Sequence, residues 1–322
     1  MTCRPASLAE ASSVPLVSVI TPVFNGERWL GEALDSALAQ SFPSLEIIVV
    51  NDGSTDSSLA IARARSHSDR RIRIIDQDNA GLPNARNQAL NLARGAYLAL
   101  LDADDAWLPD HLHAAMRAFE RDPDLGLVHA NIERIDADGG RVDIPERTWR
   151  EDMDAYEALA LRHEHVSCPT AVFSRHALET VGAFDTRFTG LGCEDRDLWL
   201  RIAARFRIRY LDQVTARYRL HPTSMSAAGE RMALARQMLI VKLAETARGA
   251  RLVAQMEAMI DSDLGLGLSE QGRHIRAIAR QWVALRQCPT DRVIQRRLVG
   301  SLLAPCRALV PQSFPATLRG RG

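Results

Sequence analysis

The chain has 322 residues, of which 46% are hydrophobic and 25% charged, a composition typical of a globular protein with a sizeable core. Its 40 Lys and Arg residues balance its 40 Asp and Glu residues, so the net charge does not indicate a nucleic-acid partner. The charge is uneven along the chain, because residues 230–322 hold 15 basic against 7 acidic residues and residues 1–229 hold 25 against 33. Lys242 is the only lysine and is followed by Leu243, so the sequence has no phosphate-binding loop that ends in Lys-Ser or Lys-Thr.

Targeting and redox signals are weak. The five cysteines, at positions 3, 168, 193, 288 and 306, include no Cys-x-x-Cys pair, which predicts free thiols in a reducing compartment. Residues 1–16 lack the apolar core of a signal peptide. No stretch approaches the roughly 18 apolar residues of a membrane-spanning helix. We therefore expect a cytoplasmic protein.

Apolar runs alternate with amphipathic stretches over the first 121 residues. The runs typical of buried strands are "LVSVIT" (16–21), "LEIIVV" (45–50), "RIRII" (71–75) and "AYLALL" (96–101). The stretches typical of helices are 27–40, 57–66, 83–95 and about 109–121. Near-continuous apolar strands that alternate with helices predict a parallel sheet covered on both faces.

The pattern changes after residue 121. "LGLVHANIERI" (125–135) and the following "DADGGRV" predict a strand and a hairpin turn. Short strands are expected over residues 170–222, with a helix near 195–206 and one or two strands over 207–222. From residue 230 onward the sequence predicts Arg-rich helices.

Three carboxylates crowd the end of the fourth predicted strand. Asp102, Asp104 and Asp105 would raise one another's pKa unless a positive group lies among them. A divalent cation would relieve this repulsion and would also bind phosphate oxygens. An acidic surface loop is the alternative reading. A calcium loop of the EF-hand type is excluded, because Trp107 and His113 stand where it needs Gly and Glu.

Polar residues also follow the second predicted strand, at Asn51 and Asp52. Ligands of parallel sheets gather at the carboxyl ends of the strands, so we expect Asp52 and the acidic group at 102–105 to face one crevice. Turn chemistry alone would explain Asp52 equally well.

Five motifs in this order resemble the large family of inverting glycosyltransferases with the GT-A fold, family 2. They are "VSVITPVFNGERWLGEALDSALAQ", "EIIVVNDGSTDSS", "NAGLPNARNQALNLARGAYLALLDADD", "GCEDRDLWLR" and "YRLHPTSMS". The resemblance implies an α/β GT-A fold, a Rossmann-like and mostly parallel sheet flanked by helices. It also implies three parts: a flexible segment 1–15, a glycosyltransferase domain 16–226 and a helical C-terminal extension 227–322.

The resemblance implies a donor-binding role for seven residues. Pro22, Phe24 and Asn25 would lie beside the nucleotide base and ribose, and Asp52 would accept hydrogen bonds from the base. The others are Arg86 at the diphosphate or metal site, Asp102 at the ribose or donor sugar, and Arg219 near the diphosphate.

The resemblance also implies metal and catalytic roles. Asp104 and Asp105 include the ligand of a Mn²⁺ or Mg²⁺ ion, and His221 would approach the metal or the diphosphate from the far side. Asp195 would be the general base, with Glu194 beside it. Without the other motifs, Glu194 and Asp195 would be explained as residues that favour a helix N-terminus.

The expected function is metal-dependent, inverting transfer of a sugar from a nucleotide-diphosphate sugar to a hydroxyl of a saccharide or lipid-linked saccharide. The expected setting is cell-surface polysaccharide or glycoconjugate synthesis. The alternatives are a sugar nucleotidyltransferase-like enzyme, which would need a Gly-rich loop with Arg and Lys where "TPVFNGERW" stands, or a non-catalytic nucleotide-sugar-binding protein. The basic C-terminal helices, including "RRLVGSLLAPCRALV", would lie on the inner face of the cell membrane, or else pack on the catalytic domain or a second subunit.

Overall fold

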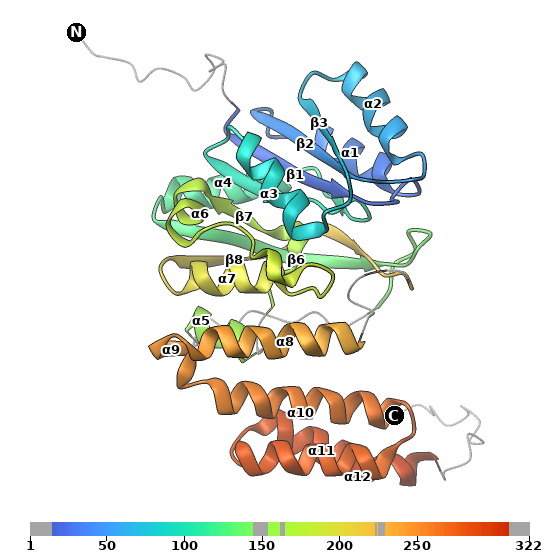
Figure 1. Ribbon diagram of the computed structural model, residues 1–322, viewed down its shortest axis with the longest axis vertical. Coiled ribbons are helices and arrows are strands. Elements are labelled where there is room, and N and C mark those ends of the chain that lie inside the picture. The colour runs from blue at the N-terminus through green and yellow to red at the C-terminus, as the bar shows by residue number, and fades with distance from the viewer. Residues whose placement is uncertain (1–14, 144–153, 162–164, 223, 225–228, 309–322) are drawn as a thin grey trace, which may run out of the picture. The chain divides into compact units, whose positions relative to one another are not determined.

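The computed structural model describes residues 15–143, 154–161, 165–222, 224 and 229–308 (Figure 1). The chain divides into two compact units, Met1–Leu159 with His163–Ala235, and Ala160–Arg162 with Arg236–Gly322. The predicted boundary at 226/227 and, except for Pro15, the predicted segment 1–15 lie outside the described residues. Each unit has an apolar core of its own.

The first unit is built around one sheet with the strand order β3-β2-β1-β4-β7-β6-β8-β5. Its described strands are β1 (Val17–Val23), β2 (Leu45–Asp52), β3 (Ile72–Gln77), β4 (Tyr97–Leu100), β5 (Ala106–Trp107), β6 (Leu125–Ile135), β7 (Val172–Ser174) and β8 (Arg207–Arg219). The pairs β1–β2, β2–β3, β1–β4 and β6–β8 are parallel, so the expected mostly parallel sheet of the GT-A fold is confirmed.

The short strand β7 breaks the parallel pattern. It enters the sheet beside Ala99 and leaves it beside Tyr97, antiparallel to both β4 and β6. The segment before it, the 3₁₀ helix η1 (Cys168–Thr170), is thereby delivered to the carboxyl end of β4. β5 is likewise antiparallel to β8.

Helices flank this sheet (Figure 1). The helices up to residue 203 are α1 (Leu30–Leu38), α2 (Ser58–Ser68), α3 (Leu82–Leu92), α4 (His111–Arg121), α5 (Ala155–Ala160), α6 (Arg175–Val181) and α7 (Glu194–Ala203), with the 3₁₀ helix η2 (Thr186–Phe188). The strand–helix alternation predicted for the first 121 residues is confirmed, and residues 207–219 form one bulged strand.

Two helices are shorter than the amphipathic pattern predicts. α1 starts at Leu30 because residues 24–29 form a turn in which Asn25 has a φ of 53°. α3 ends at Leu92 rather than at residue 95. Gly95 lies so close to β1 that a Cβ atom there would be 2.6 Å from the backbone nitrogen of Ser18.

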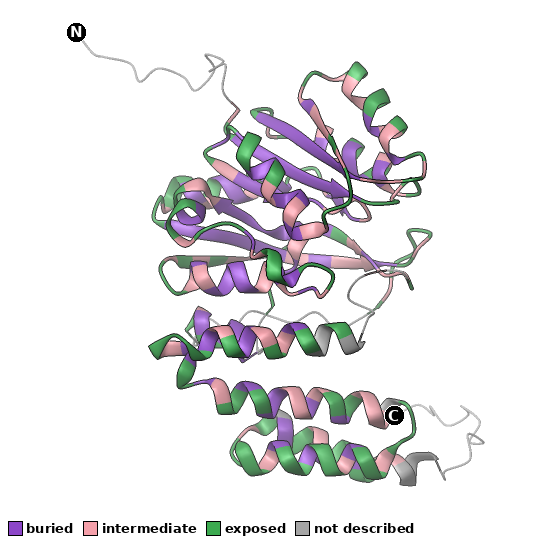
Figure 2. Cartoon of the chain, in the orientation of Figure 1, coloured by how far each residue is buried: buried purple, intermediate pink, exposed green. Residues whose placement is uncertain are grey.

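The central strands form the core. Every residue of β1 and β2 is buried, as Figure 2 shows for the middle of the sheet. Because these strands are buried, they fix the position at which the chain leaves the sheet after each of them. The polar residues that follow β1, β2 and β4 therefore have well-defined starting points at one edge.

A buried carboxylate ties the opposite edge of the sheet together. Glu46 in β2 is only 2% exposed and accepts hydrogen bonds from the Ser18 hydroxyl and the Arg94 backbone, both at 2.8 Å. The guanidinium groups of Arg73 and Arg94 lie 3.0 Å from its other oxygen. Burial alone would raise the pKa of Glu46, but these four donations outweigh it and the pKa is lowered.

The second unit is helical. It contains the end of α8 (Gly229–Ala244), then α9 (Ala247–Ala250), α10 (Val253–Glu270), α11 (His274–Gln287) and α12 (Arg292–Ala308). Ser262 and Gln281, both fully buried, exchange two hydrogen bonds between α10 and α11. No described helix combines the length and the apolar character needed to cross a bilayer.

We expect Glu46→Gln to lower the free energy of unfolding at pH 7 by about 2 kcal/mol, because charge-assisted hydrogen bonds are lost inside the sheet. The lowered pKa of Glu46 means that its contribution is present above about pH 4.5 and is lost as the pH falls further. Urea titrations at pH 7 and at pH 3 measure the free energy of unfolding of the variant and of the unaltered protein. The exposed Glu179→Gln serves as the control. If Glu46→Gln lowered the free energy of unfolding equally at pH 3 and pH 7, the charge of Glu46 would not be the cause.

Candidate active site

The turn after β1 meets the turn after β4. Gly26 lies so close to the acidic loop that a Cβ atom there would be 3.3 Å from the Cβ of Ala103. Asn25 accepts a hydrogen bond from the Thr55 backbone at 2.8 Å and donates its own N–H to Ser54 at 3.0 Å. Three of the loops that the sequence places at the strand ends are therefore neighbours.

The residues predicted to contact the nucleotide occupy different environments. Pro22 is buried within β1, whereas Phe24, just beyond it, is 55% exposed. Asp52 is 3% exposed, and its carboxylate accepts hydrogen bonds from the backbones of Ala80 and Gly81 at 2.8 and 2.9 Å. Asp52 thus holds the loop before α3 against the end of β2.

Arg86 is the centre of a buried polar cluster. It projects from α3, is 1% exposed, and donates to Glu194 and Asp102 at 2.7 Å each. A third contact reaches the Cys168 sulfur at 3.1 Å, and the guanidinium lies 5.4 Å from the centre of the Phe184 ring. One side chain thereby joins α3, the end of β4, η1 and the start of α7.

The start of α7 places two acidic residues beside Arg86. Cys193, with a φ of 67°, precedes Glu194 and Asp195, the first residues of the helix. Burial raises the pKa of Glu194 to about 7, although Arg86 opposes the shift. Burial also raises the pKa of Asp195, again against Arg86. A carboxyl group with a raised pKa gains and loses its proton closer to neutral pH than an ordinary carboxyl group does.

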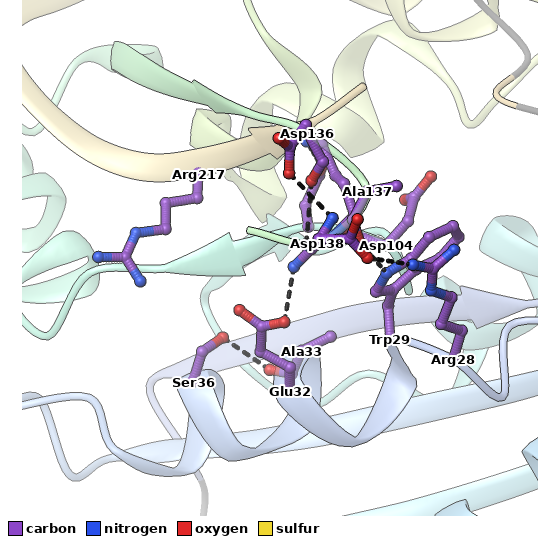
Figure 3. Close-up of polar contacts among 12 residues, drawn as sticks. Arg28, Trp29, Glu32, Ala33, Ser36, Asp104, Asp136, Ala137, Asp138 and Arg217 are labelled. Carbon is purple, nitrogen blue, oxygen red and sulfur yellow. Dashed lines mark hydrogen bonds and ion pairs between the residues drawn. The ribbon is translucent and has the colours of Figure 1, made fainter. Parts of the chain in front are cut away.

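A second polar group surrounds Asp104. Its carboxylate lies 2.8 Å from Nε2 of His221, and the His221 ring packs 4.5 Å from that of Trp29. The Trp29 indole donates to the Ala137 carbonyl at 3.1 Å, and Arg28 pairs with Asp138 at 2.6 Å. Figure 3 shows the turn before α1 meeting the segment after β6 beside Asp104.

Asp105 and Arg219 are held inside this group. Asp105 is 2% exposed, and one of its oxygens accepts the Arg219 backbone N–H at 2.9 Å. The Arg219 guanidinium donates to the Asp104 carbonyl, to the Asp136 carbonyl and to Glu32, at 2.9, 3.3 and 2.6 Å. In this structure Arg219 binds the chain itself, and its contact with a donor stays a prediction.

Asp102 links the two groups electrostatically. Its charge adds to burial in raising the pKa of Asp104, Asp105 and Asp195. The interaction between two charges is stronger in a poorly solvated region than in water. The structure thus brings the predicted metal and catalytic residues into one region.

The donor atoms suit a divalent ion that is shared with a substrate. No group of three His, Cys, Asp or Glu residues able to hold a metal occurs among the described residues. Asp104 and His221 offer one oxygen and one nitrogen 2.8 Å apart, and the Asp104 side chain is 33% exposed. The second oxygen of Asp105 is buried with no hydrogen-bond partner among the described groups. Mg²⁺ and similar ions are commonly held by one or two such residues together with phosphate oxygens.

Sequence reasoning missed the residues that support these groups: Trp29, Glu32, Cys168 and Phe184. The only signal for Trp29 is an aromatic residue in the turn that follows the first predicted strand. The contacts of Cys168 and Phe184 depend on how η1 and the segment before α7 approach Arg86, which no local pattern encodes.

A family model described as "Glycosyl transferase family 2" matches residues 18–182, about half of the chain. The chain belongs to this family. The resemblance noted in the five motifs is thereby confirmed.

Relatives include two polysaccharide synthases. The hyaluronan synthase of Pasteurella multocida is 27% identical over 222 residues, which cover 69% of this chain and 22% of the synthase. The chondroitin synthase of Escherichia coli is 35% identical over 134 residues, which cover 42% and 20%. The chain therefore spans about a fifth of the length of these relatives.

Solved structures agree on the GT-A fold. Residues 1–349 of Staphylococcus aureus TarS give a TM-score of 0.60 at 19% identity, covering 90% of this chain and 87% of that one. The mannosyltransferase PcManGT from Pyrobaculum calidifontis, in complex with GDP-Man and Mn²⁺, gives 0.62 at 22% identity, covering 92% and 83%.

We expect Arg86→Met to lower the free energy of unfolding by about 3 kcal/mol above pH 7, because it leaves buried carboxylates uncompensated. Glu194 has a raised pKa, so protonation stabilises the fold below about pH 4.5 and this stability is lost as the pH rises through about 7. At pH 5 Glu194 is largely protonated, so Arg86→Met should lower the free energy of unfolding by less than it does above pH 7. Denaturant titrations at the two pH values test this.

The matched control is Arg63→Met, which removes an ion pair whose partners are 59% and 45% exposed. It should change stability little at either pH. A loss at Arg86 that is independent of pH would show that the effect is packing alone.

Proposed function

We propose that this glycosyl transferase family 2 enzyme moves a sugar from a nucleotide-diphosphate sugar to an acceptor hydroxyl, with inversion and with a divalent metal ion. The main support is the cluster at Arg86, which holds Asp102 and Glu194 at 2.7 Å and brings Asp195 into the same poorly solvated region. Family membership favours transfer over the nucleotidyltransferase-like and non-catalytic alternatives.

Asp195 is the proposed general base. The acceptor hydroxyl gives its proton to a carboxylate oxygen of Asp195 while its oxygen attacks the anomeric carbon, and the bond from that carbon to the diphosphate oxygen breaks. Attack from the side opposite the leaving group inverts the configuration. Glu194 already binds Arg86, so we assign it to positioning the first turn of α7.

Asp104 and His221 are the proposed holders of Mn²⁺ or Mg²⁺, with Asp105 buried behind them. The ion would stabilise, as a Lewis acid, the charge that develops on the leaving diphosphate. The Mn²⁺ and GDP-Man in the PcManGT complex support this proposal. The Trp29 ring packs against the His221 ring, with 4.5 Å between the ring centres.

The proposed donor site lies along the ends of β1 and β2. The exposed Phe24 ring offers a face for a base, with Asn25 and Pro22 shaping the turn around it. Asp52 would meet the base and Asp102 the ribose or sugar. TarS has been solved with UDP-GlcNAc and PcManGT with GDP-Man, which supports a nucleotide sugar as the donor class.

The wider role is proposed from the relatives. The names hyaluronan synthase and chondroitin synthase support cell-surface polysaccharide or glycoconjugate synthesis, with a saccharide or lipid-linked saccharide as acceptor. A cytoplasmic location, with peripheral membrane association or self-association through the C-terminal helices, is part of the same proposal.

A panel of nucleotide sugars, titrated by calorimetry with and without Mn²⁺, tests the donor and metal assignments. We expect at least one donor to bind about tenfold more tightly with Mn²⁺, and Asp104→Asn to remove most of that gain because it loses a charged ligand. The control is Asp124→Asn, which is 89% exposed and outside both groups. Equal Mn²⁺ dependence in Asp104→Asn would reject Asp104 as a ligand.

Asp195→Asn should reduce sugar transfer by about 10²–10⁴-fold while sparing donor affinity, because an amide cannot accept the proton. In the unaltered enzyme the rate should fall as the pH drops and the raised pKa of Asp195 is crossed. The rate at which nucleoside diphosphate is released measures both the effect of Asp195→Asn and the pH dependence of the unaltered enzyme. Comparable turnover in Asp195→Asn would remove Asp195 from the base role.

A further inference from the structure

The second unit exposes many large apolar side chains. Thirteen such residues are exposed in the described part of the chain, and nine of them lie in the second unit, beyond residue 235. Exposed apolar side chains indicate an interaction site where several of them share one face, whereas single ones are normal.

One side of α11 holds three of these nine residues, including the most exposed, Ile275. Ile275 is 87% exposed, Trp282 51% and Val283 43%, and Ala279 between them is also exposed. Their spacing of four, seven and eight residues puts them on one side of the helix. Ala277, on the other side, is fully buried, as are Gln281 and Ala284. Helix α11 therefore has two sides of low charge, and only one of them is covered.

Arginines border this side at a hollow of about 400 Å³. The hollow is lined by Leu268, Arg273, Arg276, Ala279, Arg280 and Val283. Arg280 pairs with Asp261 at 2.6 Å. The guanidinium groups of Arg273 and Arg276 have no hydrogen bond or ion pair with any described residue. Two uncompensated cations thus lie next to an apolar surface.

We propose that this surface, the α11 face (Ile275, Ala279, Trp282 and Val283 with Arg273 and Arg276), docks on a bilayer that contains anionic phospholipids. A helix that lies in a membrane interface has this division: apolar side chains, commonly with Trp, enter the acyl boundary, and Arg binds the lipid phosphates. The surplus of basic residues beyond residue 229, 15 against 7, points the same way.

A second copy of the chain fits the α11 face less well. In a symmetric dimer the same face meets itself, so Arg273 and Arg276 would approach their own counterparts. Like charges in a desolvated contact are unfavourable, whereas lipid phosphates neutralise them. The charge of the face therefore favours lipid over self-association. This inference does not depend on the proposed reaction.

Co-sedimentation of the full chain with vesicles tests the proposal. We expect binding to phosphatidylcholine vesicles with 30% phosphatidylglycerol to exceed binding to pure phosphatidylcholine by roughly tenfold, and to weaken with salt. Ile275→Ser with Trp282→Ser, and separately Arg273→Gln with Arg276→Gln, should each reduce binding by roughly tenfold. Inorganic phosphate at 10 mM should not compete, because the apolar contribution is absent from it.

The control is Leu92→Ser, which removes an apolar side chain that is 46% exposed on α3, outside the C-terminal helices, and should leave vesicle binding unchanged. A Trp282→Phe variant should still sediment but lose the blue shift of tryptophan fluorescence that vesicles cause. Failure of the unaltered protein to sediment, or unchanged binding in the α11 variants, overturns the proposal. So does a dimer in light scattering that only the α11 variants disrupt, because the face would then bind a second copy.

Discussion

The buried guanidinium of Arg86 is the constraint on which the site depends. A buried ion pair contributes little net stability, because desolvation offsets the attraction, but removing one partner is costly. Glu194 is 108 residues from Arg86 in the sequence, and Asp102 is 16 residues away. Both must reach one side chain on α3. The arrangement therefore fixes where α7 begins relative to the end of β4, and with it the position of Asp195.

The chain itself supplies one partner for each of the crowded carboxylates at 102–105, although the pKa values of Asp104 and Asp105 stay raised. Asp102 pairs with Arg86, Asp104 contacts His221, and Asp105 accepts the backbone N–H of Arg219. Each acid thus has its own partner, from three different parts of the sequence. The sequence suggested a metal ion as the source of positive charge. In the proposed metal site, an ion would act at the exposed end of the loop, where the Asp104 side chain is 33% exposed.

The first half of the fold was predictable because its information is local. Apolar runs define β1, β2 and β4, and the polar residues after them mark the carboxyl ends of the strands, where the site lies. The reversal at β7 was not predictable, since three residues over 172–174 have no periodicity to read. The same holds for Arg86, which by pattern alone is one more helix arginine. Its burial depends on acids far away in the sequence, and the contact between Trp29 and His221 is equally nonlocal.

Two buried glutamates show how the structure separates a structural acid from one in the site. Glu46 receives four donations and its pKa is lowered, so it stays charged and holds strands together. Glu194 is equally buried but is hydrogen-bonded to a guanidinium that Asp102 also engages, and its pKa is raised to about 7. Desolvation is greater at Glu194, and the charges of Asp195 and Asp102 add to it, so the pKa of Glu194 is raised although Arg86 opposes the shift. Among the described residues, the acids whose pKa is raised lie in the turn after β4 and at the start of α7: Asp104, Asp105, Glu194 and Asp195.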